Sequence, residues 1–134
     1  MNIILYFSDQ QRYDTINETV TPNIEAMADE SIFFDNAFTC QPVCGPARAC
    51  IQTGLYASEN KCYINGISMD KDDDNTLAKV LSRQGYNTSY IGKWHLASDT
   101  AGFKPKFNVQ KKAIPEDLRG GYNDYWLSAD CLEF

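Results

Sequence analysis

A helix pattern, a glycine, a strand pattern and a polar loop follow one another between residues 76 and 95. Thr76 is a helix-capping residue, and Gly85 is the kind of residue that ends a helix. Tyr86–Ile91 is then typical of a strand, and it runs into Gly92-Lys93-Trp94-His95. A helix that feeds a strand in this way is half of a βαβ crossover, so the chain is predicted to form an α/β fold with a parallel sheet. The apolar face of the expected helix consists of Leu77, Val80 and Leu81.

The chain opens with an apolar segment, Asn2–Phe7, which stops at Ser8-Asp9. Such a run predicts a buried strand of the same parallel sheet. Ligands of parallel sheets bind just past the carboxyl ends of the strands. We therefore expect the segment Ser8–Arg12 to lie at a binding site.

The other elements are predicted from caps, prolines and glycines. A helix should start at Thr21-Pro22 and end near Glu30, and a second should run from Ala47 to a stop at Thr53-Gly54. The predicted irregular or mixed segments are Ser31–Phe38 (a short strand or extended chain), Thr39–Pro46 (a loop) and Tyr122–Phe134 (aromatic and partly helical).

Charge and length exclude several classes of protein. A chain of 134 residues with a net charge of −6 is expected to be one domain that does not bind nucleic acid or an anionic membrane. Its longest apolar run, Ile3–Phe7, is too short to span a bilayer or to serve as the core of a signal peptide. A cytoplasmic location is therefore expected, with a periplasmic or secreted one left open.

Two features that could suggest metal sites have simpler interpretations. The five cysteines include no tight pair of the kind zinc sites use, and we expect the four other than Cys44 to be reduced and mostly buried. The acidic run Asp70–Asn75 lacks the glycine and the glutamate that a calcium loop requires. We expect it to be a solvated loop or a helix N-terminus.

Three polar clusters fall beside predicted strands and helices: Asp9-Gln10, Cys44–Arg48 and Lys93–His95. Taken singly, each has a structural explanation as a turn cap, a buried thiol or a pair of surface residues. Together they lie where a parallel α/β sheet places its site. A cysteine just before a helix favours the thiolate, and Arg48 lies one helical turn further on. The spacing is CxxxR and not the CxxxxxR of thiolate phosphatases, whereas Cys–His hydrolase chemistry stays open.

The segment Cys44-Gly45-Pro46-Ala47-Arg48, followed by Thr53-Gly54, resembles the signature of type I sulfatases, C-x-P-x-R followed by T-G. Three further segments resemble motifs of the same family in the same order. They are Asn2–Asp14 (first strand and metal loop), Thr21-Pro22-Asn23-Ile24 (next helix) and Gly85–Leu96 (second strand and Lys–His motif). The resemblance covers residues 2–97, and the tail from Tyr125 to Phe134 is compatible with it.

This resemblance implies an alkaline-phosphatase-like α/β fold, with residues 1–134 as the N-terminal portion of the catalytic domain. It also implies that Cys44 is oxidised to formylglycine by a formylglycine-generating or anaerobic sulfatase-maturating enzyme. The hydrated aldehyde is a geminal diol. One hydroxyl attacks the sulfur of a sulfate ester, and the other lets the covalent sulfate leave as the aldehyde re-forms.

The resemblance also implies the roles of the other site residues. Asp9, Gln10 and position 44 would bind Ca²⁺, a hard cation that prefers oxygen ligands and offsets charge on the sulfate. Arg48 would hold the diol and the charge beside the metal, and Lys93 and His95 would contact the sulfate and the diol. The expected substrate is a sulfate ester of a small molecule or of a glycan.

Two departures from the family leave alternatives open. Gln10 stands where the family often has a second Asp, and an Asp–Gln pair also occurs in choline-sulfatase-like members and in phosphonate monoester hydrolases. Phosphonate monoesters and phosphodiesters are therefore candidate substrates too. Family members are also several times longer, and their remaining metal ligands and a second His and Lys lie downstream. The 134-residue chain is expected to be inactive by itself, and a further alternative is an inert truncated chain that associates through its uncovered faces.

Overall fold

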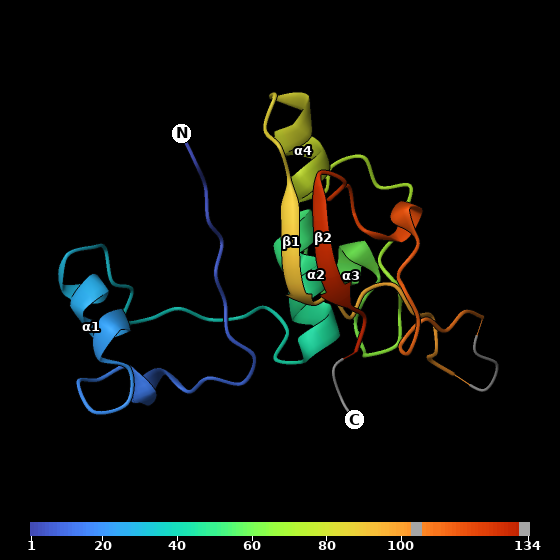
Figure 1. The fold of residues 1–134 in the computed structure, drawn as a ribbon. Helices are drawn as coiled ribbons and strands as arrows, with labels where there is room; N and C mark the ends of the chain where they lie inside the picture. The colour runs from blue at the N-terminus through green and yellow to red at the C-terminus, as the bar shows by residue number, and fades with distance from the viewer. Residues whose placement is uncertain (103–105, 132–134) are drawn as a thin grey trace. The chain divides into compact units, whose positions relative to one another are not determined.

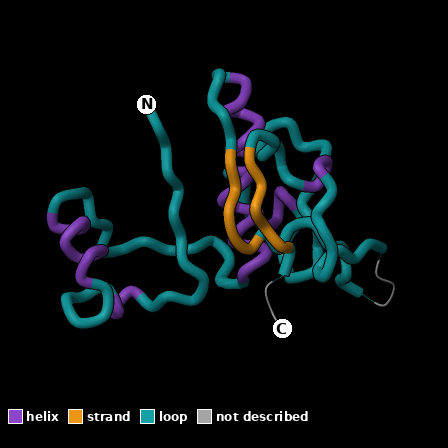
Figure 2. The backbone as a smooth tube through the Cα atoms, in the orientation of Figure 1, coloured by secondary structure: helices purple, strands orange, loops and turns teal. Residues whose placement is uncertain are grey.

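The computed structural model describes residues 1–102 and 106–131, which divide into two units, Met1–Phe38 and Thr39–Phe134. Each unit is treated by itself (Figures 1 and 2). The first unit contains η1 (Tyr13–Thr15) and α1 (Pro22–Asp29). The second contains α2 (Cys44–Thr53), α3 (Ala57–Asn60), α4 (Leu77–Arg83), β1 (Ser89–Lys93), η2 (Glu116–Leu118) and β2 (Tyr125–Ala129). Within the described residues, no helix is long and apolar enough to cross a membrane.

The sheet of the second unit consists of β1 and β2, which pair in parallel from Ser89↔Tyr125 to Lys93↔Ala129 (Figure 1). This confirms the predicted parallel sheet. The side chains alternate between the two faces: Tyr90 and Trp126 face inward, whereas Ile91 and Leu127 are exposed. The prediction of a partly helical tail was wrong in this region, because alternating burial along Tyr125–Ala129 suits a strand. Residues 132–134 of that tail lie outside the described residues.

Strand β1 begins three residues later than predicted because the preceding residues complete the end of α4. Gly85 adopts a left-handed φ of 82°, and the Tyr86 amide donates to the carbonyl of Leu81 at 3.2 Å. The Thr88 amide then donates to the Asp124 carboxylate at 2.7 Å, which aligns the starts of the two strands. The helix cap predicted from Gly85 is confirmed.

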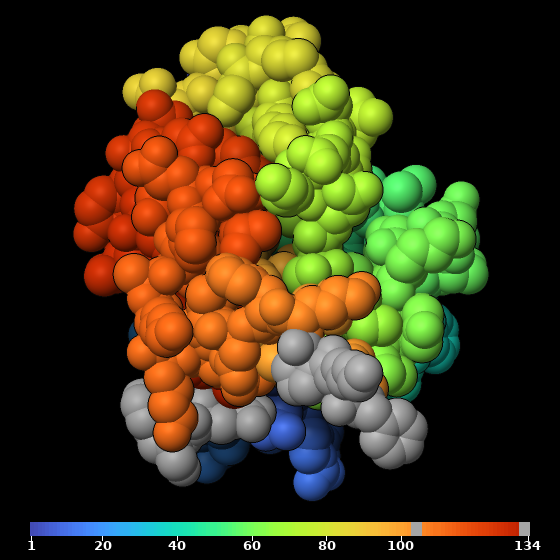
Figure 3. Space-filling model, turned by 90° about the vertical axis from the view of Figure 1, so that its right-hand side faces the viewer, coloured from blue at the N-terminus to red at the C-terminus, as the bar shows by residue number. Residues whose placement is uncertain are grey.

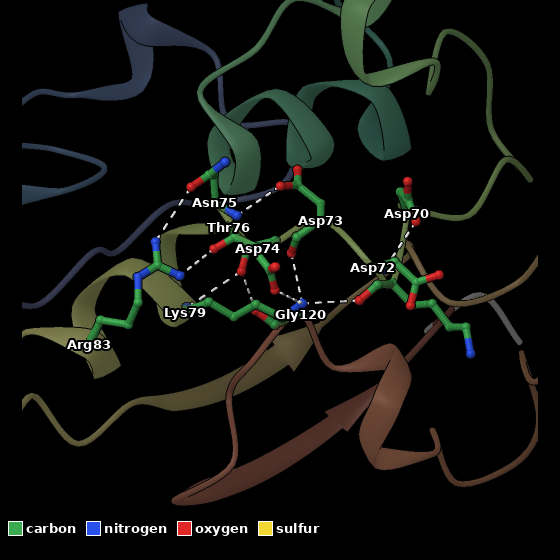
Figure 4. A network of polar contacts seen from close by, with 10 residues as sticks. Asp70, Asp72, Asp73, Asp74, Asn75, Thr76, Lys79, Arg83 and Gly120 are labelled. Atoms are coloured by element: carbon green, nitrogen blue, oxygen red, sulfur yellow. Dashed lines mark hydrogen bonds and ion pairs between the residues drawn. The ribbon is translucent and has the colours of Figure 1, made fainter.

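Helix α4 is joined to the acidic loop Asp70–Asn75 by its own basic side chains (Figure 4). The Lys79 ammonium donates to the carbonyls of Lys71 and Asp73 at 3.0 and 2.7 Å. Thr76 caps the helix as predicted and also donates to the Gly120 carbonyl at 2.6 Å. The expected solvated loop is confirmed, but the expected apolar face is wrong in part: Ala78 is the fully buried residue, and Val80 is 37% exposed.

Helix α2 begins at Cys44, three residues earlier than predicted. Pro46 does not prevent this, because amide groups in the first helical turn have no partner within the helix and proline lacks only such an amide. Val43 precedes the helix in an extended conformation, and Gly54 ends it with a left-handed φ of 69°. Cys44 therefore belongs to the first turn of the helix and not to the loop before it.

Aromatic side chains from β1, from β2 and from the residues beside these strands form the centre of the core. Trp94 is fully buried, stands edge-on to Tyr90 with ring centroids 4.9 Å apart, and donates from Nε1 to the Leu118 carbonyl at 3.0 Å. Tyr122 and Trp126 complete the cluster. The Gly66 carbonyl accepts the Thr100 amide at 2.7 Å, which joins the segment after β1 to the loop at Gly66. Figure 3 shows the green and orange surfaces of the second unit side by side.

The first unit confirms one predicted helix and corrects one predicted strand. Helix α1 starts at Pro22 as predicted, but the Thr21 hydroxyl donates to the Thr15 carbonyl instead of accepting from the first turn. Asn2–Phe7 is not a buried strand: it takes no part in the β1–β2 ladder, and Ile4 is 90% exposed. Ser31–Phe38 forms no strand, which agrees with the other form predicted for it, an extended chain, and its aromatic side chains are exposed. Apolar pattern predicts strand propensity, whereas a strand also requires a paired neighbour.

The carboxylate of Asp130 holds the segment that follows β1. Asp130 is fully buried and accepts from the amides of Ala97 and Ser98 at 2.9 and 3.0 Å. We predict that Asp130→Ala lowers the free energy of unfolding by roughly 2–4 kcal/mol, because two buried amides lose their acceptor. Urea unfolding measures this, with Asp72→Ala at an exposed position as the control. An equal decrease in the free energy of unfolding in Asp130→Ala and Asp72→Ala would contradict this role of Asp130.

Candidate active site

The first turn of α2 presents Cys44 beside the amide group of Asn65. Asn65 Nδ2 donates to Cys44 Sγ at 3.3 Å, and Asn65 Oδ1 lies 3.5 Å from the same sulfur. Oδ1 also accepts the backbone amide of Gly45 at 2.9 Å. Both a donor and an acceptor therefore face the side chain at position 44.

Gly45 allows this close approach between the helix and two loops. A Cβ at Gly45 would lie 2.9 Å from Asn65 Oδ1 and 3.5 Å from the carbonyl oxygen of His95. The first of these distances is shorter than side-chain carbons tolerate, so a larger residue would push Asn65 away. The glycine thus brings the start of α2, Asn65 and the segment after β1 together.

Arg48 connects α2 to the carboxyl end of β1. Its side chain is 7% exposed, and Nη1 donates to the Lys93 carbonyl at 2.6 Å and to the Tyr90 hydroxyl at 3.4 Å. The Tyr90 hydroxyl donates to the same carbonyl at 2.6 Å. Burial raises the pKa of Tyr90, and the positive charge of Arg48 opposes that rise, so the phenol stays protonated and able to donate.

Lys93 ends β1, and His95 follows it in an unusual backbone conformation. His95 is 8% exposed and has a φ of 61°, in the left-handed region that few residues other than glycine adopt. The Trp94 amide between them donates to the Ala129 carbonyl at 2.8 Å, which continues the pairing with β2. The second unit therefore brings together four of the predicted site residues through one helix start and one strand end: Cys44, Arg48, Lys93 and His95.

Asp9 and Gln10 lie in the first unit, within the loop that precedes η1. Gln10 has a φ of 63°, so two of the predicted site residues, Gln10 and His95, share the left-handed conformation. Backbone outliers of this kind cluster at functional sites. Across residues 1–102 and 106–131, no three His, Cys, Asp or Glu side chains are grouped as a metal ion would require. The roles predicted for Asp9 and Gln10 remain predictions.

The sequence prediction missed Asn65 and Tyr90 as neighbours of the site. Asn65-Gly66 is a recognisable turn signal, but a turn signal does not say that the asparagine will contact a cysteine twenty-one residues earlier. Tyr90 lay within the predicted strand, and the alternation of side chains between the two faces of β1 places it on the face that packs against α2. The cysteines are all free thiols, but Cys40 is exposed, contrary to the expectation that these residues are mostly buried.

Comparison with known proteins identifies relatives along most of the chain. The Sulfatase family model matches residues 1–129. The chain is 38% identical over 107 residues to an N-acetylglucosamine-6-O-sulfatase of Bacteroides thetaiotaomicron, covering 76% of this chain and 19% of that protein. It is 31% identical over 135 residues to an ulvan-active sulfatase of Formosa agariphila, covering 97% of this chain and 24% of that protein. The chain thus spans about a fifth to a quarter of the length of these relatives.

Solved structures support the same relationship at the level of the fold. A crystal structure of a protein from Bacteroides fragilis assigned as a sulfatase superposes with a TM-score of 0.69 at 30% identity, over 88% of this chain and 28% of that one. This likeness confirms the expected alkaline-phosphatase-like α/β fold class, here with the two-stranded parallel sheet described above.

The Asn65 contact can be tested by hydrogen exchange at Gly45. We predict that Asn65→Ala speeds exchange of the Gly45 amide roughly fivefold to tenfold, because that amide loses its acceptor. Asn65→Asp, which keeps an oxygen at the same position, should preserve the protection. Asn87→Ala, at an exposed asparagine, is the control. Unchanged Gly45 exchange in Asn65→Ala, followed by NMR, would refute the contact.

Proposed function

The chain belongs to the sulfatase family, and we propose that the whole protein hydrolyses sulfuric esters through a formylglycine made from Cys44. The observation that supports this most directly is the position of Cys44 in the first turn of α2, beside Asn65 and one turn from Arg48. The family signature and the geometry of the helix start thus concern the same residue.

The surroundings of position 44 suit a residue that carries two hydroxyls. Formylglycine supplies a hydrated aldehyde, in which one hydroxyl is the nucleophile and the other allows release of the sulfate. The Asn65 amide offers one donor and one acceptor to that side chain. The buried guanidinium of Arg48 places a positive charge on the same helix, which favours the negatively charged sulfate group.

Lys93 and His95 are proposed to bind the sulfate group. Both follow the carboxyl end of β1, where parallel α/β sheets bind ligands. A lysine ammonium carries charge and three donors, and an imidazole can donate to an oxygen or move a proton. Since the Arg48 and Tyr90 bonds hold the Lys93 carbonyl, the backbone that carries both residues is fixed before a substrate arrives.

Asp9 and Gln10 fit a calcium ion by the chemistry of their donors. Both offer side-chain oxygens, which this hard cation prefers, and calcium would supply positive charge against the sulfate oxygens. Two side chains account for only part of the six to eight oxygens such an ion takes. We therefore propose Asp9 and Gln10 as two of its ligands, together with position 44.

We propose a sulfated sugar as the substrate. The relative from B. thetaiotaomicron acts on N-acetylglucosamine 6-O-sulfate according to its name, and the relative from F. agariphila is described as ulvan-active. The alternative is a phosphonate monoester or phosphodiester, which the Asp9–Gln10 pair supports. We further propose a formylglycine-generating or anaerobic sulfatase-maturating enzyme as the partner that modifies Cys44.

Removing the proposed nucleophile should abolish hydrolysis. We predict that Cys44→Ala in the whole protein lowers kcat for an aryl sulfate by at least about 10³, because no neighbouring group replaces the diol. Cys40→Ala, at an exposed thiol four residues earlier, should leave kcat unchanged. Turnover by Cys44→Ala at the rate of the protein with its natural sequence would exclude the proposed nucleophile.

If the protein with its natural sequence cleaved an aryl phosphonate but not the aryl sulfate, the alternative substrate would be favoured.

The 134-residue chain by itself is predicted to show no sulfatase turnover, even with calcium and an aldehyde at position 44. Asp9 and Gln10 supply too few ligands to hold the ion firmly, and loss of one charge stabiliser typically costs about 10²–10³ in rate. A fluorogenic aryl sulfate and a calcium titration by calorimetry test this. Tight calcium binding with turnover above that of Cys44→Ala would contradict the prediction.

A further inference from the structure

The side chain of Asn65 contacts position 44 with both polar atoms of its amide group. Asn65 Nδ2 lies 3.3 Å from Cys44 Sγ, and Asn65 Oδ1 lies 3.5 Å from the same sulfur. The backbone amide of Gly45 donates to Oδ1 at 2.9 Å, and since only the oxygen can accept this bond, the orientation of the side-chain amide is fixed. Position 44 therefore faces one donor and one acceptor of known identity.

The loop that carries Asn65 is held in place by the residue that follows. Gly66 has a left-handed φ of 83°, and its carbonyl accepts the amides of Thr100 and Ala101 at 2.7 and 2.8 Å. A Cβ at Gly66 would lie only 2.6 Å from Thr100 Oγ1, so the two segments are in direct contact. Because these contacts restrain the backbone next to Asn65, its amide group is directed at position 44 before any reaction takes place.

Asn65 also supports the start of α2. The amides of the first helical turn have no partner within the helix, and Val43, at the N-cap, has no side-chain oxygen to offer them. Asn65 Oδ1 accepts one of these amides, that of Gly45, from the neighbouring loop. An amide oxygen has two lone pairs, so Oδ1 keeps one for the side chain at position 44. The helix start and residue 44 thus share the same acceptor.

The proposed formylglycine at position 44 has two forms that differ in hydrogen-bonding capacity. The aldehyde oxygen can only accept a hydrogen bond, whereas each hydroxyl of the hydrated form can also donate one. The aldehyde can therefore use the Nδ2 donor of Asn65 but not the Oδ1 acceptor. The diol can use both, because one hydroxyl accepts from Nδ2 while a hydroxyl donates to Oδ1.

We propose that Asn65 favours hydration of the formylglycine and so keeps position 44 in the form that can attack a sulfate ester; this inference rests on the proposed function. In the hydration step, the oxygen of a water molecule bonds to the aldehyde carbon, and the carbonyl double bond becomes a single bond. The former carbonyl oxygen gains a proton and the added water loses one, through solvent. Asn65 exchanges no proton in this step and forms one more hydrogen bond with the diol than with the aldehyde.

The size of the effect follows from that one additional hydrogen bond. Asn65 is exposed, so water competes for both polar atoms of its amide group and the net gain from the bond is modest. A hydrogen bond of ordinary net strength shifts an equilibrium about fivefold. We expect removal of the Asn65 amide to shift the hydration equilibrium by this amount.

Carbon NMR on the 134-residue chain tests the proposal. The chain is produced with ¹³C at the Cβ of cysteine and together with a formylglycine-generating enzyme, so that the aldehyde and diol carbons of residue 44 give separate resonances. We expect Asn65→Ala to raise the aldehyde-to-diol ratio about fivefold over the natural chain. The control Asn87→Ala, at an exposed asparagine, should leave the ratio unchanged. Because the readout is a ratio of two carbon signals, it is independent of sulfatase activity.

Asn65→Asp separates this role from support of the helix. This variant keeps an oxygen for the Gly45 amide but replaces the Nδ2 donor with a second acceptor, so its aldehyde-to-diol ratio should be equal to or below that of the natural chain. An unchanged ratio in Asn65→Ala, or a ratio in Asn65→Asp as high as that expected for Asn65→Ala, would overturn the proposal while leaving the formylglycine in place. Absence of both resonances from the natural chain would refute the formylglycine itself and, with it, this inference.

Discussion

The hydrogen bond from the Arg48 guanidinium to the Lys93 carbonyl joins the two elements on which the candidate site depends. At 2.6 Å it links a helix that begins with Cys44 to a strand that ends with Lys93. Because a charged group that is only 7% exposed is costly to bury without an acceptor, this bond constrains the position of the helix as well as its stability. The Tyr90 hydroxyl shares the same carbonyl and secures the acceptor.

The strand end is in turn held by β2 and by the residue that follows it. Pairing continues past Lys93 through the Trp94 amide, and the Asp130 carboxylate then accepts the amides three and four residues after Trp94. His95 lies between these two anchors, which explains how a buried residue with a φ of 61° is held in place. Parallel pairing of β1 with β2 therefore positions the polar residues that follow β1.

Local patterns predicted the parts of this arrangement that local chemistry determines. The cap at Thr76, the stop at Gly85 and the strand after it were predicted because each depends on residues a few positions away. The signature around Cys44 was recognised in the same way. In the second unit, Arg48 bonds the Lys93 carbonyl and Gly45 lies against the His95 carbonyl, whereas the roles of Cys44, Arg48, Lys93 and His95 stay predictions.

What sequence pattern did not predict depends on contacts between distant segments. The strand at Tyr125–Ala129 was missed because an aromatic run suits a helix or a strand until its partner is known. Asn65 was missed because only the fold brings it to Cys44. Asn2–Phe7 was predicted to be a buried strand from its apolar run and from the family resemblance, whereas burial and pairing depend on the segments around it.

The central claim is that residue 44 is a nucleophile that needs two hydroxyls to turn over, and Cys44→Ser in the whole protein tests it most directly. A serine hydroxyl can attack sulfur but has no second hydroxyl to expel the sulfate. We predict that this variant releases one product molecule per protein molecule and that turnover then stops. Mass spectrometry should find a sulfate group on the tryptic peptide 13–48, which contains residue 44. Continued turnover, with no sulfate on that peptide, would contradict it.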